Sequence, residues 1–151
     1  MSLLYKFKKE RLINGGFAGR PRILVIQGES ASIEVPALID SGCDVTVIPE
    51  SIANAIGLDM SGERNKLYAY RESNDVIQGK ATITFVGRVQ RQSVTLNNVP
   101  VLIALTKDGI EDEHDITLGV EGIFDAFDIT FKKAQNKIIL QKATGNLQLK
   151  S

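Results

Sequence analysis

The chain has 151 residues, 43% of them hydrophobic, which is enough for one well-formed core and short for two. Its 18 basic and 18 acidic residues cancel, and no basic run is long enough to follow a phosphate backbone, so we expect no nucleic-acid partner. No apolar stretch reaches the ~20 residues of a membrane-spanning helix, and the N-terminal sequence shows no secretory leader. We therefore expect one soluble, cytoplasmic domain without a membrane partner.

The first quarter of the chain divides into an arm and a strand pair. Residues 1–20 are rich in Lys, Arg and Gly, which indicates an N-terminal arm and places the folded domain at 21–151. The β-branched runs at 22–28 and 32–40 are separated only by ESA and predict a hairpin that ends at Asp40.

The next segment changes from strand to helix and back. Residues 45–48 predict a short strand, and residues 49–57 predict a short helix, because Pro49 suits a first helical turn and a glycine ends the segment. Residues 66–87 contain two extended arms around a polar centre, which predicts a long hairpin with an exposed tip at 71–75.

The second half is predicted to continue the sheet. Residues 92–105 favour a strand with a bend or bulge at Asn97 and Asn98, and the acidic segment that follows favours a solvated loop. Residues 116–127 favour a strand that ends at Gly119 and continues into a second short helix. The remaining sequence predicts a closing hairpin from DITF and KIILQ, then a last strand from NLQLK.

Asp40 interrupts an otherwise apolar run, VPALIDSGCDVTVIP, at residues 35–49. An Asp that ends a buried strand and turns through a glycine can be held by backbone donors where solvent has limited access. An Asp-Ser-Gly tripeptide alone is usually only a turn, so the interpretation depends on a second segment.

That second segment is ITLGVEGIFDAFDITFKKAQNKIIL, residues 116–140, in which an apolar-Leu-Gly strand precedes a helix and a hairpin. Together with ALIDSGCDVTVIP and the hairpin between them, this order resembles the retropepsin-like aspartic proteases over residues 22–141. The resemblance implies a mostly β fold: a closed acid-protease β-barrel with one or two short helices and one lobe per chain.

The resemblance also implies an aspartic endopeptidase that acts on polypeptides and needs no cofactor or metal. Peptide hydrolysis requires a base to activate water and an acid to protonate the carbonyl oxygen, so two carboxyls must face each other and share a proton. The chain contains a single Asp-Ser/Thr-Gly, and neither Asp125 nor Asp128 precedes a glycine. We therefore expect the second carboxyl to be Asp40 of another copy, related by a two-fold axis, so that the site exists only in a homodimer.

Position in the motif implies further roles. The catalytic set is Asp40, Ser41 and Gly42: the Ser41 hydroxyl would tie the two loops together across the axis, and the Gly42 carbonyl would orient the substrate. Asp44 matches a family Asp that binds the substrate main chain.

The family often pairs that Asp with an Arg, but Val120 stands at the Arg position here. We therefore expect Asp44 to pair with Arg20 or Arg22 instead.

The hairpin at 67–85 would be the flap that closes over the peptide, with Tyr70 and Val76 as substrate-binding residues. It lacks the closely spaced glycines of retroviral flaps.

Two other function classes stay open. The absent Arg and the glycine-poor flap also suit a catalytically weak or inactive retropepsin-like module for dimerisation or peptide binding. A thiol hydrolase would use Cys43 with His114, the only cysteine and the only histidine, although a packed thiol and a solvated acidic loop are the simpler interpretations. A single cysteine also excludes an internal disulfide and a multi-cysteine metal site.

Overall fold

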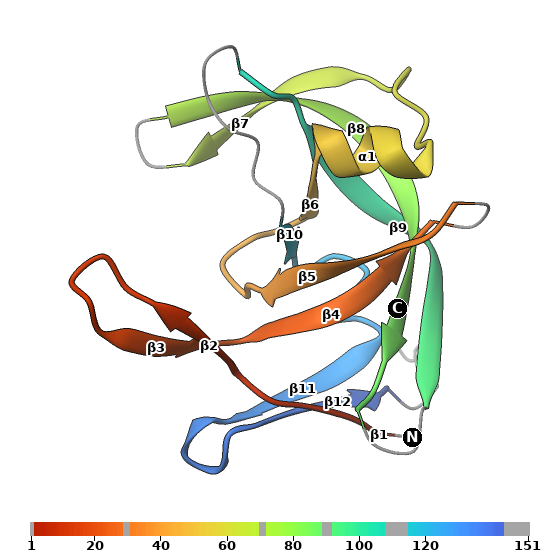
Figure 1. Cartoon of the computed structure of the whole chain (residues 1–151). Helices are drawn as coiled ribbons and strands as arrows, with labels where there is room; N and C mark the ends of the chain where they lie inside the picture. Colours follow the sequence, from red (N-terminus) through yellow and green to blue (C-terminus); the bar gives the residue numbers. More distant parts are fainter. Residues whose placement is uncertain (1, 29–30, 70–71, 89–91, 108–114, 144–151) are drawn as a thin grey trace, which may run out of the picture.

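The computed structural model describes residues 2–28, 31–69, 72–88, 92–107 and 115–143. Strands dominate these residues, which confirms the mostly β fold (Figure 1). The elements are β1 (Ser2–Tyr5), β2 (Lys8–Arg11), β3 (Phe17–Arg20), β4 (Arg22–Gln27), β5 (Ile33–Ile39), β6 (Thr46–Pro49), α1 (Glu50–Ile56), β7 (Arg64–Ala69), β8 (Glu72–Val86), β9 (Ser93–Ala104), β10 (Ile116–Leu118), β11 (Phe127–Lys132), the 3-10 turn η1 (Lys133–Gln135) and β12 (Lys137–Lys142).

The main sheet has the strand order β4-β5-β10-β6-β9-β8-β7, and β4 also pairs with β8. The path of paired strands from β4 to β8 therefore returns to β4. Two of its pairs are parallel, β5 with β10 and β6 with β9. The parallel pair β5 and β10 sets Ile39 opposite Leu118, so the residues that follow these two strands emerge together.

Both hairpins that the sequence predicts in the main sheet are present. β4 pairs with β5 along their whole length, and β7 pairs with β8 up to Ala69 opposite Glu72. The predicted tip at 71–75 is too long, because residues 72–75 already belong to β8. The bend predicted in β9 is confirmed: Asn98 has φ 54°, and the register with β8 shifts at this point.

The helix α1 forms where Pro49 and the following apolar spacing predict it. Gly57 ends it with φ 74°, a left-handed conformation that glycine adopts without a Cβ penalty. The second predicted helix is absent, since residues 120–126 form successive turns. Gly122 has φ 81° and interrupts the helical backbone there.

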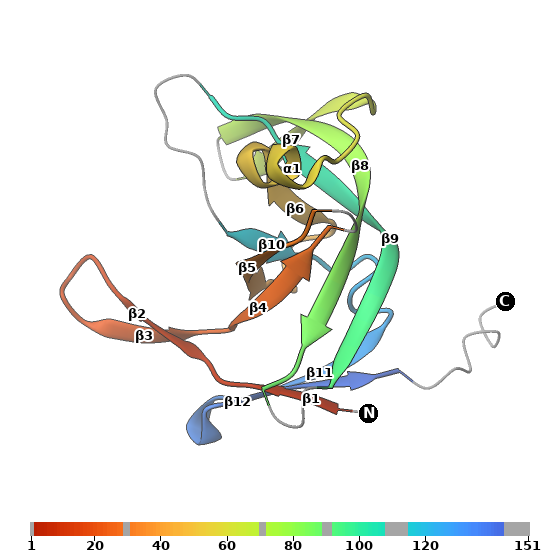
Figure 2. The ribbon, with the colours of Figure 1, turned by 45° about the vertical axis from the view of Figure 1, so that its right-hand side comes forward.

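The N-terminal segment has two parts. β1 pairs with β12, and its Leu3 and Tyr5 are 1% and 4% exposed, so the expectation of an arm outside the core is wrong for this strand. β2 and β3 pair only with each other within the described chain and project from the body (Figures 1 and 2). The predicted domain boundary after residue 20 stays a prediction.

The core is aliphatic, with Phe85 and Phe127 in edge-on contact at a ring-centroid distance of 5.0 Å. No helix among the described residues has the length and hydrophobicity needed to cross a membrane. The predicted last strand at 146–150 lies outside the described residues, as does the acidic loop apart from its ends.

Candidate active site

The loop after β5 holds the Asp40 carboxylate in a defined position. The Asp40 amide donates to the Leu118 carbonyl at 3.1 Å, and the Cys43 amide donates to the Asp40 carbonyl at 3.2 Å, which closes a tight turn. The Gly42 amide donates to Asp40 Oδ1 at 2.9 Å. Asp40 is half-buried, whereas Ser41 and Gly42 are exposed, so the loop that carries the carboxylate reaches the surface of the single chain.

The two sequence motifs meet at this loop. The Val120 amide donates to the Cys43 carbonyl, and the Glu121 amide donates to the Asp44 carbonyl, both at 2.8 Å. Because these bonds add to the one between Asp40 and Leu118, the residues after β5 and those after β10 form one backbone network.

Thr46 and Gly119 form a buried link beneath the loop. The Gly119 amide donates to Thr46 Oγ1 at 3.1 Å, and Thr46 has no exposed surface. A Cβ on Gly119 would lie 2.5 Å from the Val45 carbonyl carbon and 2.8 Å from the Thr46 nitrogen. Only glycine therefore allows this approach, and Thr46 is a site residue that the sequence analysis missed. The signal was a lone hydroxyl in the apolar run VTVI.

The sequence of residues 26–120 matches the family described as gag-polyprotein putative aspartyl protease. The chain belongs to this family. No curated protein matches it.

Two solved structures share the fold of this family member. A retropepsin-like aspartic protease from Rickettsia conorii superposes with a TM-score of 0.52 and 13% identity, over 93% of this chain and 92% of that one. The retroviral protease-like domain of Ddi1 from Leishmania major superposes with a TM-score of 0.53 and 9% identity, over 86% of this chain and 98% of that one. These likenesses confirm a retropepsin-like fold.

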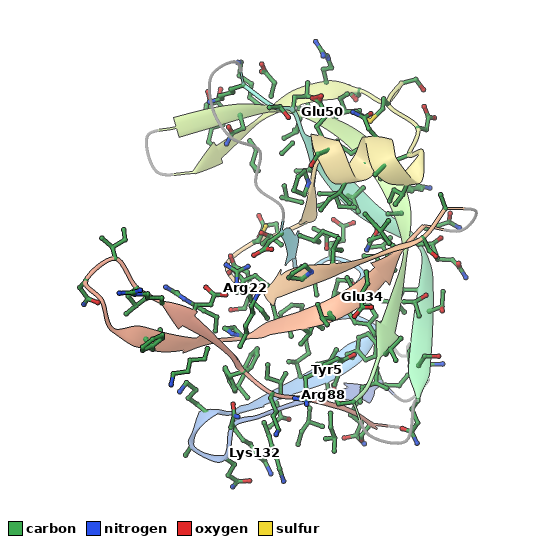
Figure 3. The ribbon with its side chains drawn as sticks, viewed as in Figure 1. Tyr5, Arg22, Glu34, Glu50, Arg88 and Lys132 are labelled. Carbon is green, nitrogen blue, oxygen red and sulfur yellow. The ribbon has the colours of Figure 1, made fainter. Side chains whose placement is uncertain are left out.

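The ion pairs near the loop differ from the expected ones. Arg22 pairs with Glu10 and, at 2.5 Å, with Asp115, and Arg20 lies 4.0 Å from the same Glu10 (Figure 3 labels Arg22). Neither arginine pairs with the exposed Asp44, so the expected pairing is wrong. The reason is topological: β4 and β10 flank β5, and this brings Arg22 at the start of β4 next to Asp115 before β10.

Cys43 is a packed thiol. Its Sγ donates to the Val45 carbonyl at 3.0 Å, and the side chain is half-buried. Burial raises the pKa of Cys43, and the carboxylates of Asp40 and Asp44 raise it further, against an opposing backbone hydrogen bond at Val45. The thiolate that nucleophilic catalysis needs is therefore disfavoured.

The structure describes two of the three predicted substrate-binding residues, Asp44 and Val76. Asp44 lies on the loop and is exposed, while Tyr70 lies outside the described residues. Val76 is in β8 and 1% exposed, so its side chain belongs to the interior of the single chain, and its role stays a prediction. The described residues contain no group of three His, Cys, Asp or Glu that could hold a metal ion.

A groove of about 690 Å³ lies elsewhere, between β1, β4 and β5. Tyr5, Arg22, Glu34 and Arg88 line it (Figure 3). None of residues 40–44 borders this groove.

Proposed function

We propose that this chain is an aspartic endopeptidase whose active site forms when the Asp40 loops of two copies meet at a two-fold axis. The observation that carries the proposal is the half-buried Asp40 carboxylate, held by the Gly42 amide on a loop bonded to the residues after β10. A loop that is fixed by backbone bonds and exposed at Ser41 and Gly42 suits a carboxylate that needs a symmetry mate.

The chemistry would use one proton shared by two carboxyls. The ionised carboxyl takes a proton from water, whose oxygen attacks the peptide carbonyl carbon, and the protonated carboxyl gives its proton to the carbonyl oxygen. As this intermediate collapses, the carboxyl that took the proton from water gives it to the leaving nitrogen, the other carboxyl takes a proton from a hydroxyl of the diol, and the C–N bond breaks. This leaves an acid, an amine and the original pair.

The substrate would be an extended polypeptide bound through its main chain. Asp44 is exposed beside the loop and is available to a substrate amide. The β7–β8 hairpin, with Tyr70 and Val76, would act as the flap that closes over the peptide and excludes water.

A catalytically weak or inactive dimerisation or peptide-binding module is the second candidate. It is favoured by Val120, which is 37% exposed where the family often places an Arg. Fold and family do not by themselves establish activity. The thiol hydrolase loses support because the pKa of Cys43 is raised.

The test is a peptide-cleavage assay at acidic pH, with and without a statine-type inhibitor. It compares the wild type with Asp40→Asn, Cys43→Ala and the matched control Asp128→Asn, an exposed carboxylate away from the loop. Loss in Asp40→Asn alone supports the endopeptidase, no cleavage by any form supports the module, and loss in Cys43→Ala alone supports the thiol hydrolase.

Two further measurements test the shared proton and the dimer. Cleavage should have a bell-shaped pH profile on the acidic side of neutral, with both limbs belonging to the pair, and a profile that is flat from about pH 4 to about pH 8 contradicts it. The mass in dilute solution should be that of a dimer, because a strict monomer cannot assemble the site.

A further inference from the structure

The β2–β3 hairpin, residues 8–20, pairs with no other strand of the described chain. It projects on the side of the molecule where β5 ends and where the β7–β8 hairpin also lies (Figure 1). Its tip residue Ile13 is 109% exposed and Phe17 is 60% exposed. An isolated two-stranded hairpin is marginally stable in water, so this one requires a covering surface or its apolar tip stays solvated.

The hairpin is strongly basic, although the whole chain has no net charge. Residues 8–20 contain four Lys or Arg and a single acidic residue, Glu10. The segments that build the loop have the opposite charge: residues 23–63 contain seven Asp or Glu and no Lys or Arg, and residues 108–128 contain eight Asp or Glu and no Lys or Arg. The basic hairpin is therefore followed in the sequence by segments whose Asp and Glu are not balanced by any Lys or Arg.

The base of the hairpin is attached to the loop. The Ile39 amide donates to the Pro21 carbonyl at 3.0 Å, and Arg22 pairs with both Glu10 and Asp115. From this base each four-residue strand extends roughly 13 Å, at about 3.3 Å per residue. The tip can therefore reach a second copy whose Asp40 loop meets this one.

We propose that this basic hairpin is a dimerisation arm that lies across a second copy of the chain. The partner covers Ile13 and Phe17, and Lys9 and Arg11 face the acidic surface around the partner's Asp44 and the partner's Glu121. Because the two hairpins of a dimer carry like charge, they repel each other side by side. Opposite charge favours packing of one copy's hairpin on the Asp40 loop of the other copy. The inference rests on the proposed function, because that function requires the dimer.

The first test removes the apolar tip. Ile13→Asp/Phe17→Asp is compared with Leu24→Asp, a substitution of another exposed apolar residue, 52% exposed on β4 of the body. We expect the tip variant to raise the dimer dissociation constant at least tenfold by sedimentation equilibrium, and cleavage per chain to become concentration-dependent. Leu24→Asp should change neither. Circular dichroism checks folding, which the solvated tip should not alter.

The second test exchanges charge between two chains. One chain carries Lys9→Glu/Arg11→Glu, and the other carries Asp44→Lys/Glu121→Lys. Pairing is the only readout of this test, because Asp44 is also a proposed substrate-binding residue. Each homodimer then sets like charges against each other, whereas the mixed dimer restores both contacts. Native mass spectrometry should show the mixed dimer well above the half expected from random pairing, and random pairing overturns the arm.

The outcomes separate the two proposals. A dimeric, active wild type whose dissociation constant is unchanged by Ile13→Asp/Phe17→Asp overturns the arm and leaves the proposed function standing. A wild type that is monomeric at every concentration overturns both. A dimer that weakens in the tip variant but cleaves no peptide supports the arm and contradicts the endopeptidase.

Discussion

The amide of Gly119 donates a hydrogen bond to Thr46 Oγ1 at 3.1 Å, and both residues are buried beneath the Asp40 loop. The two residues are 73 positions apart. This bond ties β6 to the residue after β10, and it adds a buried side-chain link to the backbone bonds that Val120 and Glu121 make to the Asp40 loop.

Thr46→Val should lower the free energy of unfolding by about 1–3 kcal/mol, because it keeps the shape of the side chain but leaves the Gly119 amide buried without an acceptor. Urea denaturation measures the change. The matched control is Thr84→Val, whose hydroxyl bonds Thr95 Oγ1 at 2.9 Å near the surface, where water can replace it. Equal effects for the two substitutions would contradict a special role for Thr46.

Arg22 should couple energetically to Asp115 and not to Asp44. A double-mutant cycle of Arg22→Ala with Asp115→Ala should give a coupling of about 1 kcal/mol, since both side chains are largely shielded from water. The same cycle with Asp44→Ala should give no coupling within about 0.3 kcal/mol. A clear coupling with Asp44 would restore the ion pair that the sequence analysis expected.

Cys43 should alkylate only at elevated pH. Because burial and the neighbouring carboxylates raise the pKa of Cys43, less thiolate is present at a given pH than in the unfolded chain. When the rate of alkylation by iodoacetamide is plotted against pH, its midpoint should therefore lie at a higher pH for the native protein than for the same chain in denaturant. Restricted access lowers the rate without moving this midpoint, and a midpoint below that of the unfolded chain would refute the assignment.

Tyr5→Phe should stabilise the protein by about 1 kcal/mol near neutral pH, because the buried Tyr5 hydroxyl has no hydrogen-bond partner among the described residues. Burial also raises the pKa of Tyr5. Only the unfolded chain can then ionise this group as pH rises above about 10, so the wild type loses stability there and the variant loses less. Urea denaturation at about pH 7 and about pH 11 tests both expectations.

Tyr68→Phe is the control for this experiment, because Tyr68 is 72% exposed and its substitution removes no buried hydroxyl. A destabilised Tyr5→Phe would mean that the Tyr5 hydroxyl does have a partner.

Structural features that depend only on residues close together in the sequence were predictable. The hairpin of β4 and β5 follows from β-branched runs around a short turn, α1 follows from Pro49 and the apolar spacing behind it, and the bend at Asn98 follows from two asparagines inside a strand. The prediction of a second helix was wrong for an equally local reason. Gly122 adopts a left-handed conformation that the helical spacing of the apolar residues does not indicate.

The features that the tertiary structure decided join distant parts of the chain. Leu3 enters the core because β1 pairs with β12 at the other end of the sequence, and Arg22 chooses Glu10 and Asp115 because strand order places them there. By itself, the sequence determined the family pattern, the turn at Asp40 and most strands, since alternation and turn chemistry act over a few residues. The side chains that meet beneath that turn are set by which strands end next to each other. That order is fixed only when the sheet has folded.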